Sequence, residues 1–347
     1  MKQLIIAAMA LAGLMSCDKS EIIPAAPIEA GPDKVLNISL TSDKGYELTR
    51  GYFNGTTEPE PWEKKITSME VFVCNDVRNL IIRRTLSDDE VARMQFKLSV
   101  PRNSVTNKMT VVCVANYQIP PNMGALGDLA TMLDDLPTAY NCVGDASCPG
   151  EKWDSGFTMS AHAEIIGLNT NPSASIEMTL RRTVAKIVVR VAIDPQFTTN
   201  HNGGVLEITK ASVVRTSAAG WITWINENSP ATDMNFSHTV NAVKSETAKE
   251  FVFYVYPNKR LSWYGENNPA IQIEGLFDRD GDPATQDDIF KVTYEVFINK
   301  NSYGTINRNQ VYKYDLTVKG LNGAQVESAF RVDDWRPPTT EDIDQGN

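Results

Sequence analysis

The chain has 347 residues, with 43 acidic against 33 basic side chains and a formal net charge of −10. This length allows two domains with separate cores. The acidic balance argues against nucleic-acid binding, which needs clustered lysine and arginine. After the first seventeen residues no apolar run reaches membrane-spanning length.

The first seventeen residues predict a lipoprotein signal. Lys2 precedes an apolar run at 4–14, and Leu-Met-Ser-Cys at 14–17 is similar to a bacterial lipobox. In this interpretation the sulfur of Cys17 is acylated and the lipid holds the protein at a membrane. An ordinary secretory signal with a chance cysteine is the alternative. Residues 18–34 are polar and rich in proline, which predicts a flexible tether.

Most of the remaining sequence predicts short strands. Apolar and polar residues alternate at 35–40, which is typical of a half-buried strand, and leucines at helical spacing predict one helix over 126–136. Further strands are expected at 65–74, 109–115, 157–168, 174–180, 184–193, 205–215, 250–256, 270–277, 291–298, 311–319 and 325–335. The sequence therefore predicts an all-β protein with minor α content, built from β-sandwiches.

A loop near 170–175 suggests where the chain divides. We expect an N-terminal β-sandwich domain at 35–177. A C-terminal β-sandwich domain is expected at 178–347, ending in a terminal strand and a polar tail.

The cysteines have different expected states. Cys142 and Cys148 bracket a short loop and predict a disulfide in an oxidising compartment. Cys74 and Cys113 each lie in an apolar, β-branched run. They are either buried thiols that pack as small hydrophobes or a pair across neighbouring strands, and the sequence leaves both open.

Catalytic motifs are missing from the sequence. It has no Gly-x-Ser-x-Gly, no His-Glu-x-x-His and no phosphate-binding glycine loop, so we expect neither an enzyme nor a cofactor. Asp278, Asp280 and Asp282 are a weak calcium candidate, but Pro283 and Ile289 break the EF-hand pattern and favour a polar hairpin loop. The aspartate pairs at 88–89, 134–135 and 333–334 are interpreted as solvated surface.

Aromatic side chains raise a second hypothesis, which is glycan binding by stacking of sugar faces on exposed rings. The candidates are Trp221, Trp224, Trp263 and Tyr264. Packing in the core is the favoured interpretation of these rings.

Several segments occur together in a recognisable order. Besides the signal and the first strand they are Arg-Gly-Tyr-Phe at 50–53, the strand at 66–73, Met-Thr-Val-Val-Cys-Val-Ala-Asn at 109–116, Leu-Arg-Arg-Thr-Val-Ala-Lys-Ile at 180–187, Ile-Asn-Arg-Asn-Gln-Val-Tyr-Lys-Tyr at 306–314 and Val-Asp-Asp-Trp at 332–335. In their order and spacing they resemble the fimbrillin-type major fimbrial subunits of Bacteroidota, which build type V pili.

The resemblance implies two tandem transthyretin-like β-sandwich domains. It also implies export as an outer-membrane lipoprotein precursor, cleavage after an arginine, and a final place in a cell-surface fimbrium. Arg50, followed by Gly51, fits the cleavage site best because it lies in an accessible loop sequence. The pairs at 83–84 and 181–182 compete, but both adjoin predicted strands.

The first strand then becomes a removable plug. Leu36, Ile38 and Leu40 lie on one face of it, and its loss would open an apolar groove with unpaired backbone edges. A strand from a neighbouring subunit would fill that groove, and the head-to-tail contact would propagate into a filament. The candidate donor residues alternate along the last strand: Val326, Ser328, Phe330 and Val332.

The expected partners follow from this scheme. They are other copies of the chain or related pilus subunits, the outer membrane through the lipid of the precursor, and adhesive ligands on host or bacterial surfaces, but not nucleic acid. Two alternatives stay open. One is a monomeric surface lipoprotein that binds glycans, and the other is an anchor or tip subunit of the same pilus.

Overall fold

The computed structural model describes residues 32–41, 61–135, 156–217, 219–223, 236–242, 248–258, 268–282, 284–285, 287–302, 304–322 and 325–334. Several sequence predictions fall outside these residues. They are the predictions made for Cys17, Arg50, Gly51, Cys142, Cys148, Trp224, Trp263, Tyr264 and the polar tail. No helix in the described ranges is long and apolar enough to cross a membrane.

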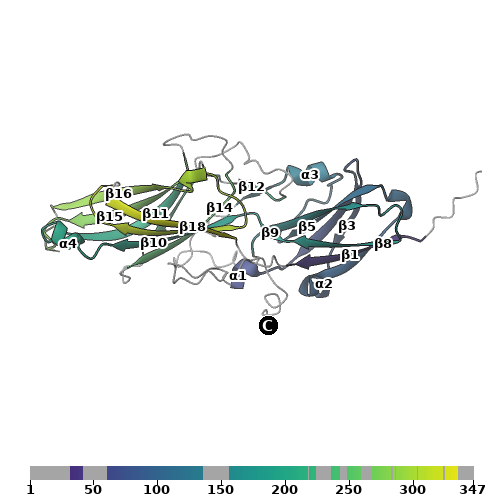
Figure 1. Cartoon of the computed structure of the whole chain (residues 1–347), viewed down its shortest axis with the longest axis horizontal. Helices are drawn as coiled ribbons and strands as arrows, with labels where there is room; N and C mark the ends of the chain where they lie inside the picture. The colour runs from purple at the N-terminus through teal and green to yellow at the C-terminus, as the bar shows by residue number, and fades with distance from the viewer. Residues whose placement is uncertain are drawn as a thin grey trace, which may run out of the picture.

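The described chain forms two lobes that lie end to end (Figure 1). In the first lobe a three-stranded sheet, in the order β4-β1-β8, faces a five-stranded sheet, in the order β3-β2-β5-β7-β9. The strands are β1 (Lys34–Thr41), β2 (Met69–Cys74), β3 (Leu80–Thr85), β4 (Gln95–Val100), β5 (Lys108–Ala115), β7 (Met159–Ile166), β8 (Ser173–Thr179) and β9 (Arg181–Arg182). Apolar side chains from both sheets make one core between them.

The second lobe is built in the same way from two four-stranded sheets. Their orders are β14-β10-β17-β18 and β13-β11-β15-β16. The strands are β10 (Ala185–Ile193), β11 (Val205–Thr216), β13 (Phe236–Asn241), β14 (Lys249–Val255), β15 (Ala270–Asp278), β16 (Ile289–Phe297), β17 (Gln310–Val318) and β18 (Val326–Asp334). A second apolar core lies between these sheets, and the all-β prediction is confirmed.

Unbroken apolar runs in the sequence correspond to strands that are covered on both faces. One face of β2 and β5 points into the first core. The other face, with Phe72 and Val112, packs under the segment that carries α3 (Leu126–Ala130). A strand buried on both sides has no solvent face to make polar, which is why alternation is missing there.

Short helices connect the strands. They are α1 (Pro61–Lys64), α2 (Asp88–Arg93), α3 and α4 (Phe197–Asn200), together with 3-10 turns at Arg102–Ser104 and Lys300–Ser302. The predicted helix over 126–136 is wrong beyond Ala130. The chain turns there and β6 (Leu133–Asp135) pairs with β12 (Ala219–Trp221), so a long-range strand pairing replaces the helical turn that the leucine spacing favours.

The β6–β12 pair also joins the two lobes. Ile222, which follows β12, packs in the apolar cluster beside α3. A second junction cluster contains Phe157, Val184, Tyr254, Tyr256 and Val311. The chain passes from the first pair of sheets to the second at residues 183–184. The proposed domain boundary between 177 and 178 stays a prediction.

Candidate functional site

The opening strand β1 is the middle strand of its sheet. It pairs antiparallel with β4, where Ile38 faces Phe96, and parallel with β8, where Ile38 faces Ile176. Since β1 lies between them, its removal would leave the facing edges of β4 and β8 without partners. Edges of this kind are templates for another strand.

One face of β1 is buried in the first core. The exposed fractions of Leu36, Ile38 and Leu40 are 0%, 2% and 5%. Val35, on the opposite face, is 37% exposed. Burying an aliphatic side chain of this size stabilises a fold by roughly 1.5–3 kcal/mol, so the three residues are the main apolar attachment of the strand. They occupy the place expected from the alternation of the sequence.

Polar side chains add little to this attachment. Lys34 Nζ donates to the Asn171 carbonyl at 2.8 Å, and Ser39 Oγ donates to the Ile176 carbonyl at 3.4 Å. Both acceptors are backbone oxygens, and in an exposed bond Asn37 Nδ2 donates weakly to Ser175 Oγ at 3.4 Å. The strand is therefore held by backbone pairing and by an apolar face, and any other strand with the same alternation could supply both.

Residues 42–60, with the proposed cleavage site, separate β1 from α1. The two competing arginine pairs lie in paired strands, because residues 83 and 84 belong to β3 and residues 181 and 182 to β9. Arg83 contacts both carboxylate oxygens of Glu70, at 2.6 and 3.2 Å. Arg182 is fully buried. A protease needs an accessible, extended segment, and neither site offers one in the folded chain.

Glu63 anchors the chain that follows the proposed cleavage site. Its carboxylate is fully buried and accepts from Lys186 Nζ at 2.7 Å and from the Tyr254 hydroxyl at 2.5 Å. Its backbone carbonyl accepts from Arg182 Nε at 2.9 Å. These partners belong to β9, β10 and β14 at the junction of the lobes, so α1 is fixed without help from β1. Nothing in the sequence around Glu63 signals that its carboxylate is buried.

Among the described strands, β18 is the last in the chain, lies at the edge of its sheet and pairs only with β17. Of its predicted donor residues, Val326 packs against the second core, Ser328 is exposed, and Phe330 and Val332 are 39% and 37% exposed. Phe330 stacks on Tyr314 with ring centroids 4.7 Å apart. The four residues share one face, as predicted, but this face is far less buried than that of β1.

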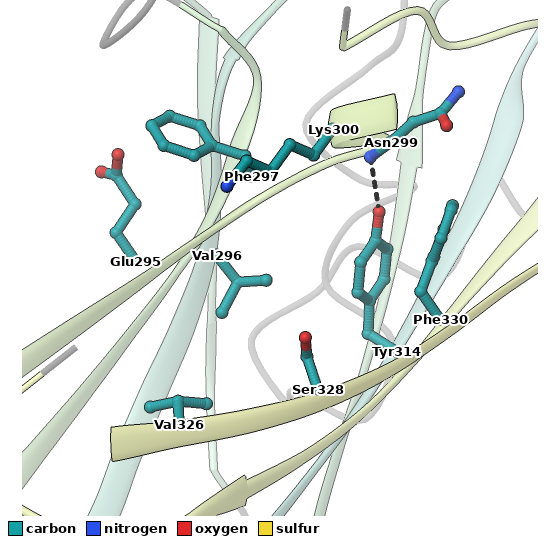
Figure 2. A pocket seen from close by; sticks show the side chains of 9 residues that line it. All are labelled: Glu295, Val296, Phe297, Asn299, Lys300, Tyr314, Val326, Ser328 and Phe330. Carbon is teal, nitrogen blue, oxygen red and sulfur yellow. Dashed lines mark hydrogen bonds between the residues drawn. The ribbon is translucent and has the colours of Figure 1, made fainter. Parts of the chain in front are cut away.

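An open groove borders three of these residues, Val326, Ser328 and Phe330. It has a volume of about 390 Å³ and lies between β18 and the end of β16, as Figure 2 shows. Its lining residues are Glu295, Val296, Phe297, Asn299, Lys300, Tyr314, Val326, Ser328 and Phe330. The Asn299 backbone N–H donates to the Tyr314 hydroxyl at 2.8 Å across the groove. Among the described residues, the groove leaves Ser328 and Phe330 of β18 without a covering side chain from β16.

The aspartate cluster is in the loop between β15 and β16. Carboxylate oxygens of Asp278, Asp280 and Asp288 lie within 4.8 Å of one another, so Asp288 and not Asp282 completes the group. Backbone N–H groups of the loop donate to these side chains, for example Gly281 to Asp278 at 2.8 Å and Asp282 to Asp280 at 2.9 Å. This last bond is the main reason why the pKa of Asp280 is lowered. The carboxylates thus brace a polar hairpin loop.

The cysteine alternatives that the sequence left open are resolved for Cys74 and Cys113. Cys113 points into the core between the sheets, whereas Cys74 packs on the opposite face of the same sheet. Both are buried free thiols. Burial raises the pKa of Cys74 to about 11 and raises that of Cys113 as well. A cross-strand disulfide between them is ruled out by their opposite orientation.

The interpretation of the aspartate pair at 333–334 as solvated surface is wrong for Asp333. Asp333 was expected on the solvated surface, but its side chain is only 9% exposed and lies 3.1 Å from Lys313 Nζ. Lys313 lies between two tyrosines in β17, but this strand also carries Gln310, Asp315 and Thr317, so its sequence gives no signal that Lys313 is buried with a partner.

Comparisons with known proteins give structural relatives only. No protein-family model matches the chain, and no curated protein matches it. A fimbrilin from Porphyromonas gingivalis W83 has a TM-score of 0.60 at 14% identity, covering 89% of this chain and 99% of that chain. A candidate cell adhesion protein from Bacteroides eggerthii has a TM-score of 0.59 at 14% identity, covering 89% and 98%. The chain has the fold of fimbrial subunits.

The fimbrial-subunit fold extends over nearly the whole of each relative. The tip fimbrial protein Mfa3 from Porphyromonas gingivalis has a TM-score of 0.53 at 14% identity, covering 88% of this chain and 100% of that chain. At the level of the fold, these likenesses confirm the resemblance drawn from the sequence.

Proposed function

We propose that this protein is a subunit of a bacterial surface fimbria that assembles by donor-strand exchange. In this proposal it is exported as a lipoprotein acylated at Cys17, cut between Arg50 and Gly51, and released from the membrane with the loss of β1. The observation that carries the proposal is the position of β1: it is a buried middle strand that precedes the proposed cleavage site.

The geometry of the first lobe supports an acceptor role. Without β1, the inward side chains of β4 and β8 would line an apolar groove, and the edges of both strands would offer unpaired backbone groups. Glu63 and α1 would keep the new N-terminal segment attached to the junction of the lobes. The rest of the fold would therefore stay largely intact and could accept a strand with the same alternation of apolar and polar residues.

The geometry of the second lobe supports a donor role. β18 ends the described chain, lies at a sheet edge and carries alternating apolar residues that are only partly buried. Insertion into the groove of another copy would bury the face made by Val326, Ser328, Phe330 and Val332. This face is partly exposed in the monomer, so its burial would favour insertion. Since donor and acceptor lie in different lobes, the contact is head-to-tail and extends into a filament.

This function requires no catalytic group and no cofactor. Its partners are further copies or related pilus subunits, with adhesive ligands on host or bacterial surfaces bound by the finished fimbrium. In the proposal the precursor resides at the outer membrane through its lipid, and the mature subunit resides in the cell-surface fimbrium.

The experiment is limited digestion of the purified precursor with an arginine-specific protease. We expect N-terminal sequencing to give a start at Gly51 and gel electrophoresis to give SDS-resistant ladders. Arg50→Ala should block both results. The matched control is Arg181→Ala, which removes an exposed arginine from a paired strand and should leave both unchanged.

Other results would redirect the proposal. A cut at residue 50 that leaves only monomers would contradict a self-polymerising subunit and would favour an anchor or tip subunit. An uncut monomer that binds to a glycan array would support the glycan-binding alternative and contradict assembly by strand exchange.

A further inference from the structure

A buried ion pair fastens β18 to β17. Lys313 Nζ lies 3.1 Å from Asp333 Oδ2, and the two side chains are 8% and 9% exposed. Arg331, two residues before Asp333 on the same strand, donates from Nε to Asp333 Oδ1 at 2.5 Å. In the register of the two strands Arg331 faces Lys313 and Asp333 faces Val311, so the ion pair crosses the ladder diagonally.

Among the described residues Lys313 has Asp333 as its counter-charge, whereas the Asp333 carboxylate is shared between Lys313 and Arg331. Neither Lys313 Nζ nor Asp333 Oδ2 has a hydrogen-bonding partner in the described part of the chain. A buried charge without a partner is strongly unfavourable, whereas a charge that regains water is not. Lys313 and Asp333 are therefore a buried ion pair when β18 is paired with β17 (seated), and separate hydrated charges when β18 is released.

Besides the backbone ladder with β17, the other side-chain attachments of β18 are more exposed. The side chains of Phe330 and Val332 remain more than a third exposed. The ion pair between Lys319 and Glu327 at the beginning of the strand has exposed fractions of 49% and 67%, and exposed pairs contribute little. The buried pair near the C-terminal end is thus the polar contact that most distinguishes seated β18 from released β18.

We propose that the Lys313–Asp333 pair is a latch that keeps β18 on its own β17 and limits the rate at which the strand is released for exchange. This inference rests on the proposed function. When Lys313 and Asp333 are both charged, release of β18 hydrates both side chains and so offsets the loss of the ion pair. The latch therefore fixes the register of β18 on β17 but still allows release. With Asp333 neutralised, seated β18 would cover an uncompensated Lys313 and release would be favoured.

Two variants test the latch in opposite directions. Asp333→Asn should speed β18 release by on the order of tenfold to a hundredfold, because Lys313 stays buried without a counter-charge. The double variant Lys313→Met and Asp333→Leu should slow release, since apolar replacement of a buried ion pair is neutral or stabilising. Glu327→Gln, which neutralises the exposed pair on the same strand, is the matched control and should change nothing.

Two readouts separate the latch from assembly itself. Hydrogen exchange of the β18 amides in the uncut precursor reports seating before any cleavage, with the β10 amides as an internal check that the lobe is folded. The rate at which SDS-resistant ladders form after Arg-specific cleavage reports exchange. Asp333 lies on the face opposite the four donor residues, so the substitution leaves the donor face intact.

The expected result is faster exchange of the β18 amides and faster ladder formation in Asp333→Asn, with both slower in the double variant. If wild-type chains form ladders and neither variant differs from them, the latch is wrong and the proposed function stands. If wild-type chains form no ladder after cleavage, the proposed function fails, and the role of the latch in exchange fails with it even where the β18 amides respond.

Discussion

The attachment of β1 can be weakened at one side chain without changing the product of the proposed cleavage after Arg50. Ile38 is 2% exposed and packs in the core opposite Phe96 and Ile176. Replacing a buried isoleucine with alanine removes buried area and leaves a cavity, at a typical loss of about 2–5 kcal/mol. We take roughly 3 kcal/mol for Ile38→Ala, because β1 is a middle strand with apolar neighbours on both sides.

This loss should be measurable in the uncut precursor. A lobe of this size shifts its melting temperature by about 2–4 °C for each kcal/mol. We therefore expect the first thermal transition to fall by about 6–12 °C in Ile38→Ala. Val35→Ala, on the exposed face of the same strand, is the control and should change stability by less than about 0.5 kcal/mol.

The same variant has a kinetic consequence. After cleavage at residue 50 the product of Ile38→Ala is chemically identical to the wild-type product, so any difference in assembly must come from release of β1. A plug held less tightly by roughly 3 kcal/mol should leave up to about a hundredfold faster, since each 1.4 kcal/mol is a factor of ten. Ladders should therefore form sooner. Equal melting temperatures and equal ladder rates for wild type and Ile38→Ala would refute the plug reasoning.

Three further predictions concern the junction, the sheet and the thiols. Glu63→Gln leaves Lys186 without its counter-charge and should cost roughly 3 kcal/mol in urea unfolding of cut and uncut chains alike; an effect confined to the uncut form would contradict it. Burial lowers the pKa of His162 from 6.5 to about 4, so the unfolded state takes up its proton first and stability falls as pH drops from 6.5 towards 4. Allowing for partial exposure, the loss is at most about 2 kcal/mol and should vanish in His162→Gln, as pH-dependent unfolding would report. Cys74 and Cys113 should resist alkylation in the native protein and react on unfolding, and peptide mapping that finds either labelled at native pH would contradict their burial.

The candidate site could be predicted from the sequence only in part. Alternation alone placed Leu36, Ile38 and Leu40 on one buried face of β1, and the structure places them there. Alternation also placed the donor residues on one face of β18. It did not show that this face borders an open groove, because the groove depends on how far β16 extends over the opposite sheet.

Buried charges were hidden from the sequence for a similar reason. Asp333 is interpreted as surface when only its neighbours in the chain are considered, but Lys313 from the paired strand compensates its charge. Glu63 likewise becomes buried only because Lys186 and Tyr254 reach it from strands more than a hundred positions away.

By itself the sequence determined the all-β composition, the faces of the main strands and the resemblance to fimbrial subunits. The first two follow from local periodicity, which records which side of a strand avoids water, and the resemblance comes from the order and spacing of the motifs. Only the tertiary structure decided which strands are neighbours: the parallel pairing of β1 with β8, where Lys34 meets Asn171 from 137 positions away, and the β6–β12 pair that replaced part of a helix. Pairing energy comes from backbone groups that every residue carries, so the amino-acid pattern does not specify the partner until the whole core is assembled.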